Sequence, residues 1–185
     1  MKNIIIIACF MIFTNCIGQT VSLETMAQCN IQSQTCPQAT YIKDVNNSLN
    51  KFIGTWKGTL EGKNYEFNFI KKENVGDSQK WDMLIGRVKI INSNGTIEYN
   101  NFNRADTETK FTGFNLIKDL KAYRMFFFGD KSECIDHGDL YLRIKPETPN
   151  NMTIFFLPNN DIVTQNCNNF KTTIPSEKII RVVRQ

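Results

Sequence analysis

Apolar and polar residues alternate along many short segments of the chain, most clearly over residues 65–69, Tyr-Glu-Phe-Asn-Phe. A period of two places successive side chains on opposite faces, as in a strand with one buried face. After Phe52 such segments recur between turn residues, which is typical of an all-β sandwich or barrel. The pattern predicts strands near residues 52–60, 63–71, 80–91, 95–100, 111–118, 121–129, 139–145, 151–157 and 177–184.

A helical spacing of apolar residues precedes these strands. Ile42, Val45 and Leu49 predict a short helix over residues 41–49. The later strands are joined by short links without a crossover helix, which favours an antiparallel meander. Closing the meander hides its edges. We therefore expect an all-β fold, a single antiparallel up-and-down barrel of about 8–10 strands with a short N-terminal helix.

The predicted links differ in length, and the short and long ones alternate. The links 61–62, 92–94, 119–120 and 146–150 are brief and fall at one end of such a meander. The longer links 72–79, 101–110, 130–138 and 158–176 fall at the other end, together with the segment that precedes the first strand. A further strand at residues 162–164 would change the end assigned to the last link, 158–176, but not the ends assigned to the earlier links. Binding residues concentrate in loops, so the long-link end is the expected binding face.

Residues 1–19 have the order of a secretory signal: Lys2, an apolar run from Ile4 to Phe13, and small or polar residues up to Gln19. The run is shorter than the roughly 20 residues that span a bilayer, so we expect cleavage and no membrane span. The protein is then secreted or periplasmic. A lipid anchor at Cys16 is the alternative. Residues 20–40 are predicted to be an extended segment tied by disulfides, and residues 41–185 to be the barrel domain.

Four cysteines follow the predicted signal: Cys29, Cys36, Cys134 and Cys167. An even number in an exported chain indicates two disulfides. The last two long links share an end of the meander, which predicts a Cys134–Cys167 disulfide. The two remaining cysteines then form Cys29–Cys36. Bridges from the N-terminal segment to the barrel loops are the alternative. The rival metal site, Cys134-x-x-His137, lacks a second ligand pair. We expect neither a metal nor a cofactor.

A second motif lies at the two ends of the barrel domain. Gly54-Thr55-Trp56 opens the first strand, and the last strand carries Arg181 and Arg184. This combination resembles the lipocalin and fatty-acid-binding-protein superfamily (calycins). The resemblance implies a lipocalin-like barrel in which Gly54 and Trp56 are structural and an arginine packs on the indole, with Arg184 the first choice and Arg181 the second. The chain also resembles small exported Bacteroidota proteins of unknown function.

Alternation also predicts which side chains face the barrel interior. The expected ligand-binding residues are Trp56, Tyr65, Phe67, Phe69, Tyr123, Met125, Phe127, Leu140 and Leu142, with Ile144 on the same face as the last two. A barrel of this size is either filled by such side chains or holds one small ligand. Both interpretations stay open at this point.

Charge and motifs exclude some function classes. The net charge of +4 is too small and too evenly spread for a nucleic-acid partner. The acidic segment 130–139 contains the single histidine, but it matches no catalytic or calcium-loop spacing. We expect a monomeric, non-enzymatic binding protein that holds a small apolar molecule in its barrel. The alternative is a protein-interaction or inhibitor scaffold that uses the long-link end of a filled barrel.

Overall fold

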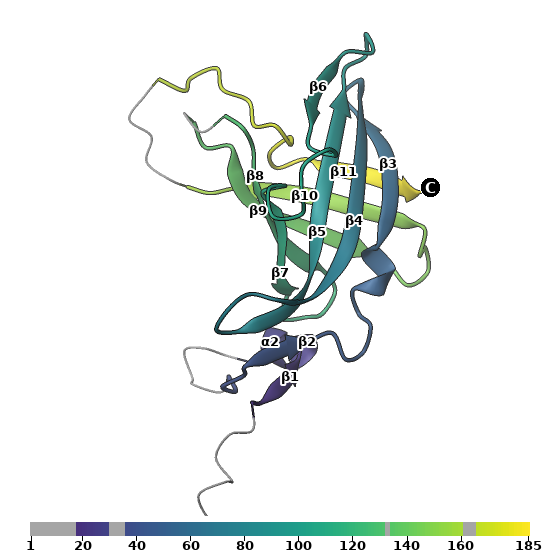
Figure 1. The fold of residues 1–185 in the computed structure, drawn as a ribbon. Coiled ribbons are helices and arrows are strands. Elements are labelled where there is room, and N and C mark those ends of the chain that lie inside the picture. The colour runs from purple at the N-terminus through teal and green to yellow at the C-terminus, as the bar shows by residue number, and fades with distance from the viewer. Residues whose placement is uncertain (1–17, 30–35, 132–133, 161–165) are drawn as a thin grey trace, which may run out of the picture.

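The computed structural model describes residues 18–29, 36–131, 134–160 and 166–185 (Figure 1). Residues 1–17 of the predicted signal, with Cys16 among them, and the segment 162–164 lie outside the described residues. Two helices, α2 (Leu23–Gln28) and the 3-10 turn η2 (Asn50–Phe52), accompany the strands. The strands are β1 (Thr20–Ser22), β2 (Tyr41–Lys43), β3 (Gly54–Leu60), β4 (Lys63–Val75), β5 (Lys80–Ile91), β6 (Ile97–Asn100), β7 (Phe111–Leu116), β8 (Tyr123–Phe128), β9 (His137–Ile144), β10 (Asn151–Pro158) and β11 (Ile179–Arg184).

The fold is all-β, with a closed antiparallel barrel of 8 strands. The sheet order is β5-β4-β3-β11-β10-β9-β8-β7, and the pair Ile85–Thr112 joins β5 to β7 and closes the ring. All nine predicted strands are present. Two of them, β6 and β7, both run antiparallel to β5 and pair with successive parts of it. They therefore occupy one barrel position as two halves of an interrupted strand.

This interruption corrects the predicted sorting of the links. Because β6 and β7 run in the same direction, each link after β7 lies at the opposite end of the barrel from the end that a regular meander predicts. The links 76–79, 117–122 and 145–150 share the end where η2 and Trp56 lie, which we call the base end. The turns 61–62 and 92–96 and the links after β8 and β10 lie at the far end. The prediction of one long-link end is therefore wrong.

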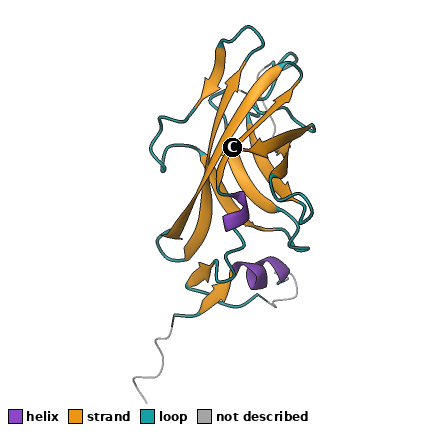
Figure 2. Cartoon of the chain, turned by 90° about the vertical axis from the view of Figure 1, so that its right-hand side faces the viewer, coloured by secondary structure: helices purple, strands orange, loops and turns teal. Residues whose placement is uncertain are grey.

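Both predicted disulfides are formed, Cys29–Cys36 and Cys134–Cys167. They lie at opposite ends of the barrel, not at one end as expected. Cys134 and Cys167 belong to the far-end links after β8 and β10, which do share an end. Cys29 and Cys36 lie in the N-terminal segment at the base end, which Figure 2 shows packed beneath the barrel with its helix.

The N-terminal segment also differs from its prediction. The helix is not at residues 41–49 but at α2, inside the segment that was expected to be extended. Ser22 caps α2 by accepting a hydrogen bond from the Thr25 amide at 3.1 Å, and Leu23 is fully buried. Ile42 instead pairs with Trp81, because β2 lies between β1 and β5 in a small parallel extension of the sheet. Pairing with the barrel overrides the local helical spacing.

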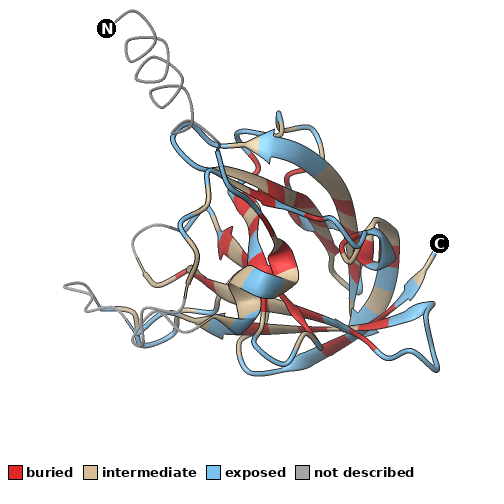
Figure 3. Cartoon of the chain, turned by 90° about the horizontal axis from the view of Figure 1, so that it is seen from below, coloured by how far each residue is buried: buried red, intermediate tan, exposed pale blue. Residues whose placement is uncertain are grey.

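Aromatic side chains fill the barrel. Buried positions alternate with exposed ones along the strands (Figure 3), and the predicted interior residues are all buried. The rings of Tyr65, Phe67 and Phe69 stack along β4 with centroids 6.3 and 6.1 Å apart. Phe111 and Phe127 continue the packing edge to face at 5.4 Å. Such contacts give the interior the close packing of a solid core.

Trp56 closes the base end. Its indole is fully buried and donates a hydrogen bond to the Phe52 carbonyl at 2.8 Å. The Arg184 guanidinium lies 4.4 Å from the indole ring centre and donates to the carbonyls of Ile53 and Lys51 at 2.5 and 2.6 Å. Gly54 has φ of 119°, and a β carbon there would lie 3.3 Å from this guanidinium, so glycine suits the position. Arg181 is exposed on the outer wall.

Replacing the two tryptophans tests this closure. We expect Trp56→Ala to lower the free energy of unfolding by about 3–5 kcal/mol, because it removes a fully buried ring and leaves a cavity. Trp81, half-buried on the outer wall, is the matched control, and Trp81→Ala should cost less than about 1.5 kcal/mol. Urea unfolding measures both. Similar losses in the two variants would contradict the role of Trp56 at the base.

The two disulfides should contribute unequally. They join residues 33 and 7 positions apart. In the chain-entropy model, Cys134→Ala/Cys167→Ala should lower stability by about 3–4 kcal/mol and Cys29→Ala/Cys36→Ala by about 2–2.5 kcal/mol. Thermal or urea unfolding of the two double variants gives the order. A larger loss of stability in the Cys29→Ala/Cys36→Ala variant would contradict this order. It would show that the short disulfide stabilises the N-terminal segment through contacts that do not depend on loop length.

Candidate functional site: a cleft between the N-terminal segment and the barrel wall

The structure places the predicted ligand-binding residues in the packed interior. Among the hollows on the surface of the described chain, four have volumes of about 310 to 630 Å3. Two of the predicted interior residues line these four hollows, Tyr65 in one and Ile144 in another. One interior polar atom has no partner among the described residues, the hydroxyl of Tyr99 on β6, a residue only 8% exposed. Burial raises the pKa of Tyr99 to about 12.

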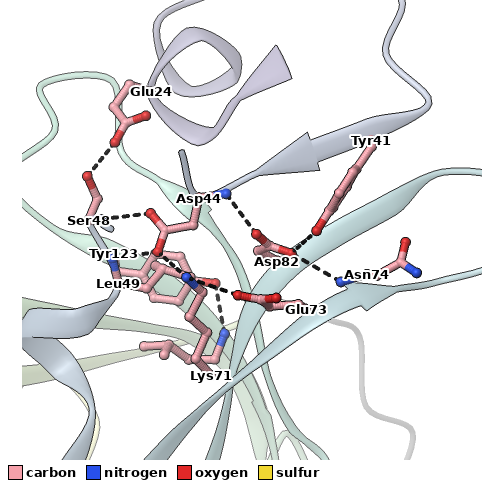
Figure 4. Close-up of polar contacts among 11 residues, drawn as sticks. Glu24, Tyr41, Asp44, Ser48, Leu49, Lys71, Glu73, Asn74, Asp82 and Tyr123 are labelled. Carbon is pink, nitrogen blue, oxygen red and sulfur yellow. Dashed lines mark hydrogen bonds and ion pairs between the residues drawn. The ribbon is translucent and has the colours of Figure 1, made fainter. Parts of the chain in front are cut away.

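A buried polar cluster joins the N-terminal segment to the base end (Figure 4). The carboxylate of Asp82 on β5 is fully buried and accepts hydrogen bonds from the Tyr41 hydroxyl at 2.5 Å, the Asp44 amide at 2.9 Å and the Asn74 amide at 3.1 Å. Burial and this hydrogen bond raise the pKa of Tyr41 to about 12. The cluster therefore ties β2 and the residue that follows it to the end of β4 and the start of β5.

Asp44 is the second buried carboxylate of the cluster. It accepts from the Ser48 amide at 2.7 Å and pairs with the Lys71 ammonium at 2.9 Å. Burial alone would lower the pKa of Lys71, but the hydrogen bond and charge of Asp44, with those of nearby acids, raise it overall. Ser48 in turn donates to Glu24 on α2. Because Asp44 and Asp82 are paired and hydrogen-bonded, this cluster is a structural tie that fixes the position of α2.

With α2 fixed, a cleft of about 550 Å3 remains between the N-terminal segment and the outer wall of the barrel. One side is formed by α2 and the Cys29–Cys36 disulfide. The opposite side is formed by β7 and the turn that follows it, with contributions from β5, β8 and β9. The lining residues are Met26, Ala27, Cys29, Cys36, Gln79, Trp81, Phe114, Asn115, Leu116, Ile117, Lys118, Arg124 and Tyr141.

Aromatic rings stack on the barrel side of this cleft. Trp81 and Phe114 are stacked with centroids 6.0 Å apart, and Phe126 meets Phe114 edge to face at 5.2 Å. The Arg124 guanidinium lies 4.3 Å from the Phe114 ring centre, which is a cation–π distance. Phe114 is still 40% exposed. The cleft therefore offers flat apolar surface next to a positive charge.

The charges of the lining are positive. Its two charged residues are Lys118 and Arg124, and no Asp or Glu is among the lining residues. Asp139 on β9 lies beside the cleft, with a carboxylate oxygen 3.7 Å from Arg124. That separation is long, and both side chains are partly exposed, so the pair is weak. Burial and Asp139 raise the pKa of Tyr141 at the cleft edge, so its hydroxyl stays neutral. An anionic group is favoured over a cation here.

The acidic segment 130–139 does not form a comparable site. Cys134 is bonded to Cys167, so it is not a free thiolate. Asp136 is buried and accepts hydrogen bonds from the Thr173 amide and hydroxyl at 2.6 and 2.7 Å. His137 stacks on the ring of Phe128 at 5.4 Å. The disulfide and the hydrogen bonds of Asp136 join the two far-end links to each other, and the His137 stack joins β8 to β9, so these contacts have a structural role.

Sequence reasoning missed the cleft residues. One signal was available: residues 125–128 are Met-Phe-Phe-Phe, so both faces of this strand are apolar. Strict alternation of apolar and polar residues predicts polar side chains on the outer wall, where this strand instead has Phe126 and Phe128. The apolar outer face indicated a covered or binding surface. The contribution of α2 and the disulfide had no signal, because it depends on the packing of the N-terminal segment.

Comparisons with known proteins give a family but no activity. The model of a family of unknown function, DUF6705, matches residues 1–145. Neither a curated protein nor a solved structure matches the chain significantly. The barrel is consistent with a calycin-like fold. None of the helices in the described part of the chain has the length and apolarity that crossing a bilayer requires.

The buried ion pair behind the cleft can be tested with adjacent lysines. We expect Lys71→Met to lower the free energy of unfolding by about 3–5 kcal/mol, because it leaves the buried Asp44 carboxylate without its counter-charge. Lys72 pairs with Asp106 on the surface, so Lys72→Met should change stability by less than about 1 kcal/mol. Urea unfolding at neutral pH compares them. Equal effects would mean that the cluster does not hold the N-terminal segment.

Proposed function

We propose that this chain, which belongs to the DUF6705 family of unknown function, is an exported, monomeric and non-enzymatic binding protein. Its ligand is a small molecule with a flat apolar body and an acidic group, and its site is the cleft on the outer wall. The interior of the barrel serves as the core that holds this wall in shape.

The observation that carries the proposal is the contrast between interior and outer wall. The interior rings pack against one another and are buried, whereas Phe114 remains exposed beside a hollow of about 550 Å3. Small-molecule sites are usually concave, mostly apolar and about 300–1,000 Å3 in volume, with a few polar groups that orient the ligand. Trp81 and Phe114 supply the apolar surface, and Arg124 and Lys118 supply the polar groups.

The compartment supports the same proposal. Two disulfides indicate an oxidising, extracellular or periplasmic environment. The N-terminal sequence has the order of a secretory signal, which supports export. A wall of the cleft includes Cys29 and Cys36, so the site depends on the oxidised form of the protein.

A second candidate is the function expected from the sequence, a small apolar molecule inside the barrel. The Tyr99 hydroxyl favours it, because a buried hydroxyl without a partner is costly and a ligand atom would satisfy it. This ligand would have to displace some of the interior rings. Interior binding therefore stays a prediction, and the experiment below separates it from binding in the cleft.

An anionic aromatic dye tests where the protein binds. Anilinonaphthalene sulfonate should bind the folded protein with a stoichiometry near one and gain fluorescence in apolar surroundings. We expect Phe114→Ala to weaken binding about tenfold or more, because it removes the exposed ring of the cleft. Arg124→Gln should weaken it severalfold by removing the positive charge. Fluorescence titration gives both values.

Two control variants distinguish binding in the cleft from binding elsewhere on the outer wall or inside the barrel. Phe128 is also an exposed phenylalanine on the outer wall but does not line the cleft, so Phe128→Ala should leave dye affinity unchanged. Phe127→Leu is a mild change inside the barrel and should also leave it unchanged. An effect of Phe127→Leu without one of Phe114→Ala would place the ligand in the barrel. No binding by the unchanged protein would contradict both candidates.

A further inference from the structure

A second hollow lies at the base end, on the other side of the turn 117–122 from the cleft. It has a volume of about 630 Å3 and an apolar floor of Leu120, Ile144 and Pro146. On β9, Tyr141 lines the cleft and Arg143, two residues later on the same face, lines this hollow. The two hollows are therefore neighbours on one wall but have different linings.

Cations surround the apolar floor. Lys51 from η2, Lys121 from the turn, and Arg143 and Lys145 from the end of β9 line the hollow, against one carboxylate, Glu147. A smaller hollow of about 310 Å3 shares Arg143 and Lys145 and adds Arg181 from β11. Two hollows that share Arg143 and Lys145 are thus lined by five cations from four parts of the chain.

These cations have no carboxylate partners. Among the described residues, no Asp or Glu oxygen lies within 4.0 Å of the charged groups of Lys51, Lys121, Arg143, Lys145 or Arg181, although all five are exposed. Some exposed cations elsewhere are paired, as Lys57 is with Glu66 and Lys178 is with Glu61. Others, such as Lys110 and Lys171, also lack a carboxylate partner within the described part of the chain but line neither of these hollows. Like charges that gather without neutralisation repel one another, so a bound anion would relieve this repulsion.

We propose that the hollow is a binding site for a phosphate- or sulfate-bearing molecule. Arg143 lines both this hollow and the smaller one of about 310 Å3, and its planar guanidinium suits two oxygens of one phosphate or sulfate group. Lys121 and Lys145 act as point charges beside it. The concave shape and the apolar floor favour a discrete soluble molecule over the flat surface of an anionic membrane. This site is additional to the cleft and does not depend on ligand binding there.

Isothermal titration calorimetry at low ionic strength tests the site, with sodium pyrophosphate as the probe and the disulfide-bonded exported protein as the sample. Arg143→Gln/Lys145→Gln should weaken pyrophosphate binding about tenfold or more. The matched control, Lys110→Gln/Lys171→Gln, removes the same two charges from exposed far-end positions outside the hollows and should change binding less than about twofold. Phe114→Ala should retain pyrophosphate binding, so failure of the cleft and failure of this site are distinguishable.

Lipid vesicles separate the two sources of the phosphate group. Sedimentation with phosphatidylglycerol vesicles should show no more binding than with phosphatidylcholine vesicles. Binding to the anionic vesicles without binding of pyrophosphate would overturn the proposal in favour of a lipid surface. No pyrophosphate binding, or equal losses in the two double variants, would also overturn it, since the first shows no site and the second shows only a general effect of net charge.

Discussion

The filling of the barrel interior is the constraint on which the rest of this structure depends. Eight strands enclose a space that inward-facing side chains can occupy completely, and here stacked and edge-to-face rings occupy it. Trp56 and Arg184 complete this packing at the base end, where the first and last barrel strands pair. Because the interior acts as a core, the surfaces available for recognition are those on the outer wall and at the two ends.

The outer wall gains its concave surface from the N-terminal segment. A smooth barrel wall of alternating polar side chains offers little shape, but α2 and the Cys29–Cys36 disulfide add a second side to the cleft. The segment stays in place through the buried carboxylates Asp44 and Asp82, which lie at the base end and bind groups on both sides of the junction. Such a buried, paired cluster fixes one arrangement because any shift leaves a buried charge without partners.

The cleft and the basic hollow divide one wall into an aromatic part and a cationic part. The turn 117–122 separates them, with Lys118 on one side and Lys121 on the other. Both sites combine apolar surface with positive charge, but the balance differs, since exposed rings dominate the first and unpaired cations the second. The modest net charge of the whole chain conceals this local concentration, because acids elsewhere on the surface are paired with their own cations.

The sequence by itself determined the all-β class, the nine strand positions and most of the inward-facing side chains, because alternation and local turn residues encode them. It predicted both cysteine pairs from the even number of cysteines and the shared end of two links, but the structure was needed to exclude bridges from the N-terminal segment to the barrel loops. Arg184 over Trp56 followed from a resemblance, whereas strand parity could not separate it from Arg181. Only the tertiary structure decided that β6 and β7 share one barrel position, and this decided which links lie together. It also decided that Ile42 pairs in a sheet and that α2 covers the wall near Phe114. These features depend on contacts between residues distant in the chain, which no local pattern of side chains specifies.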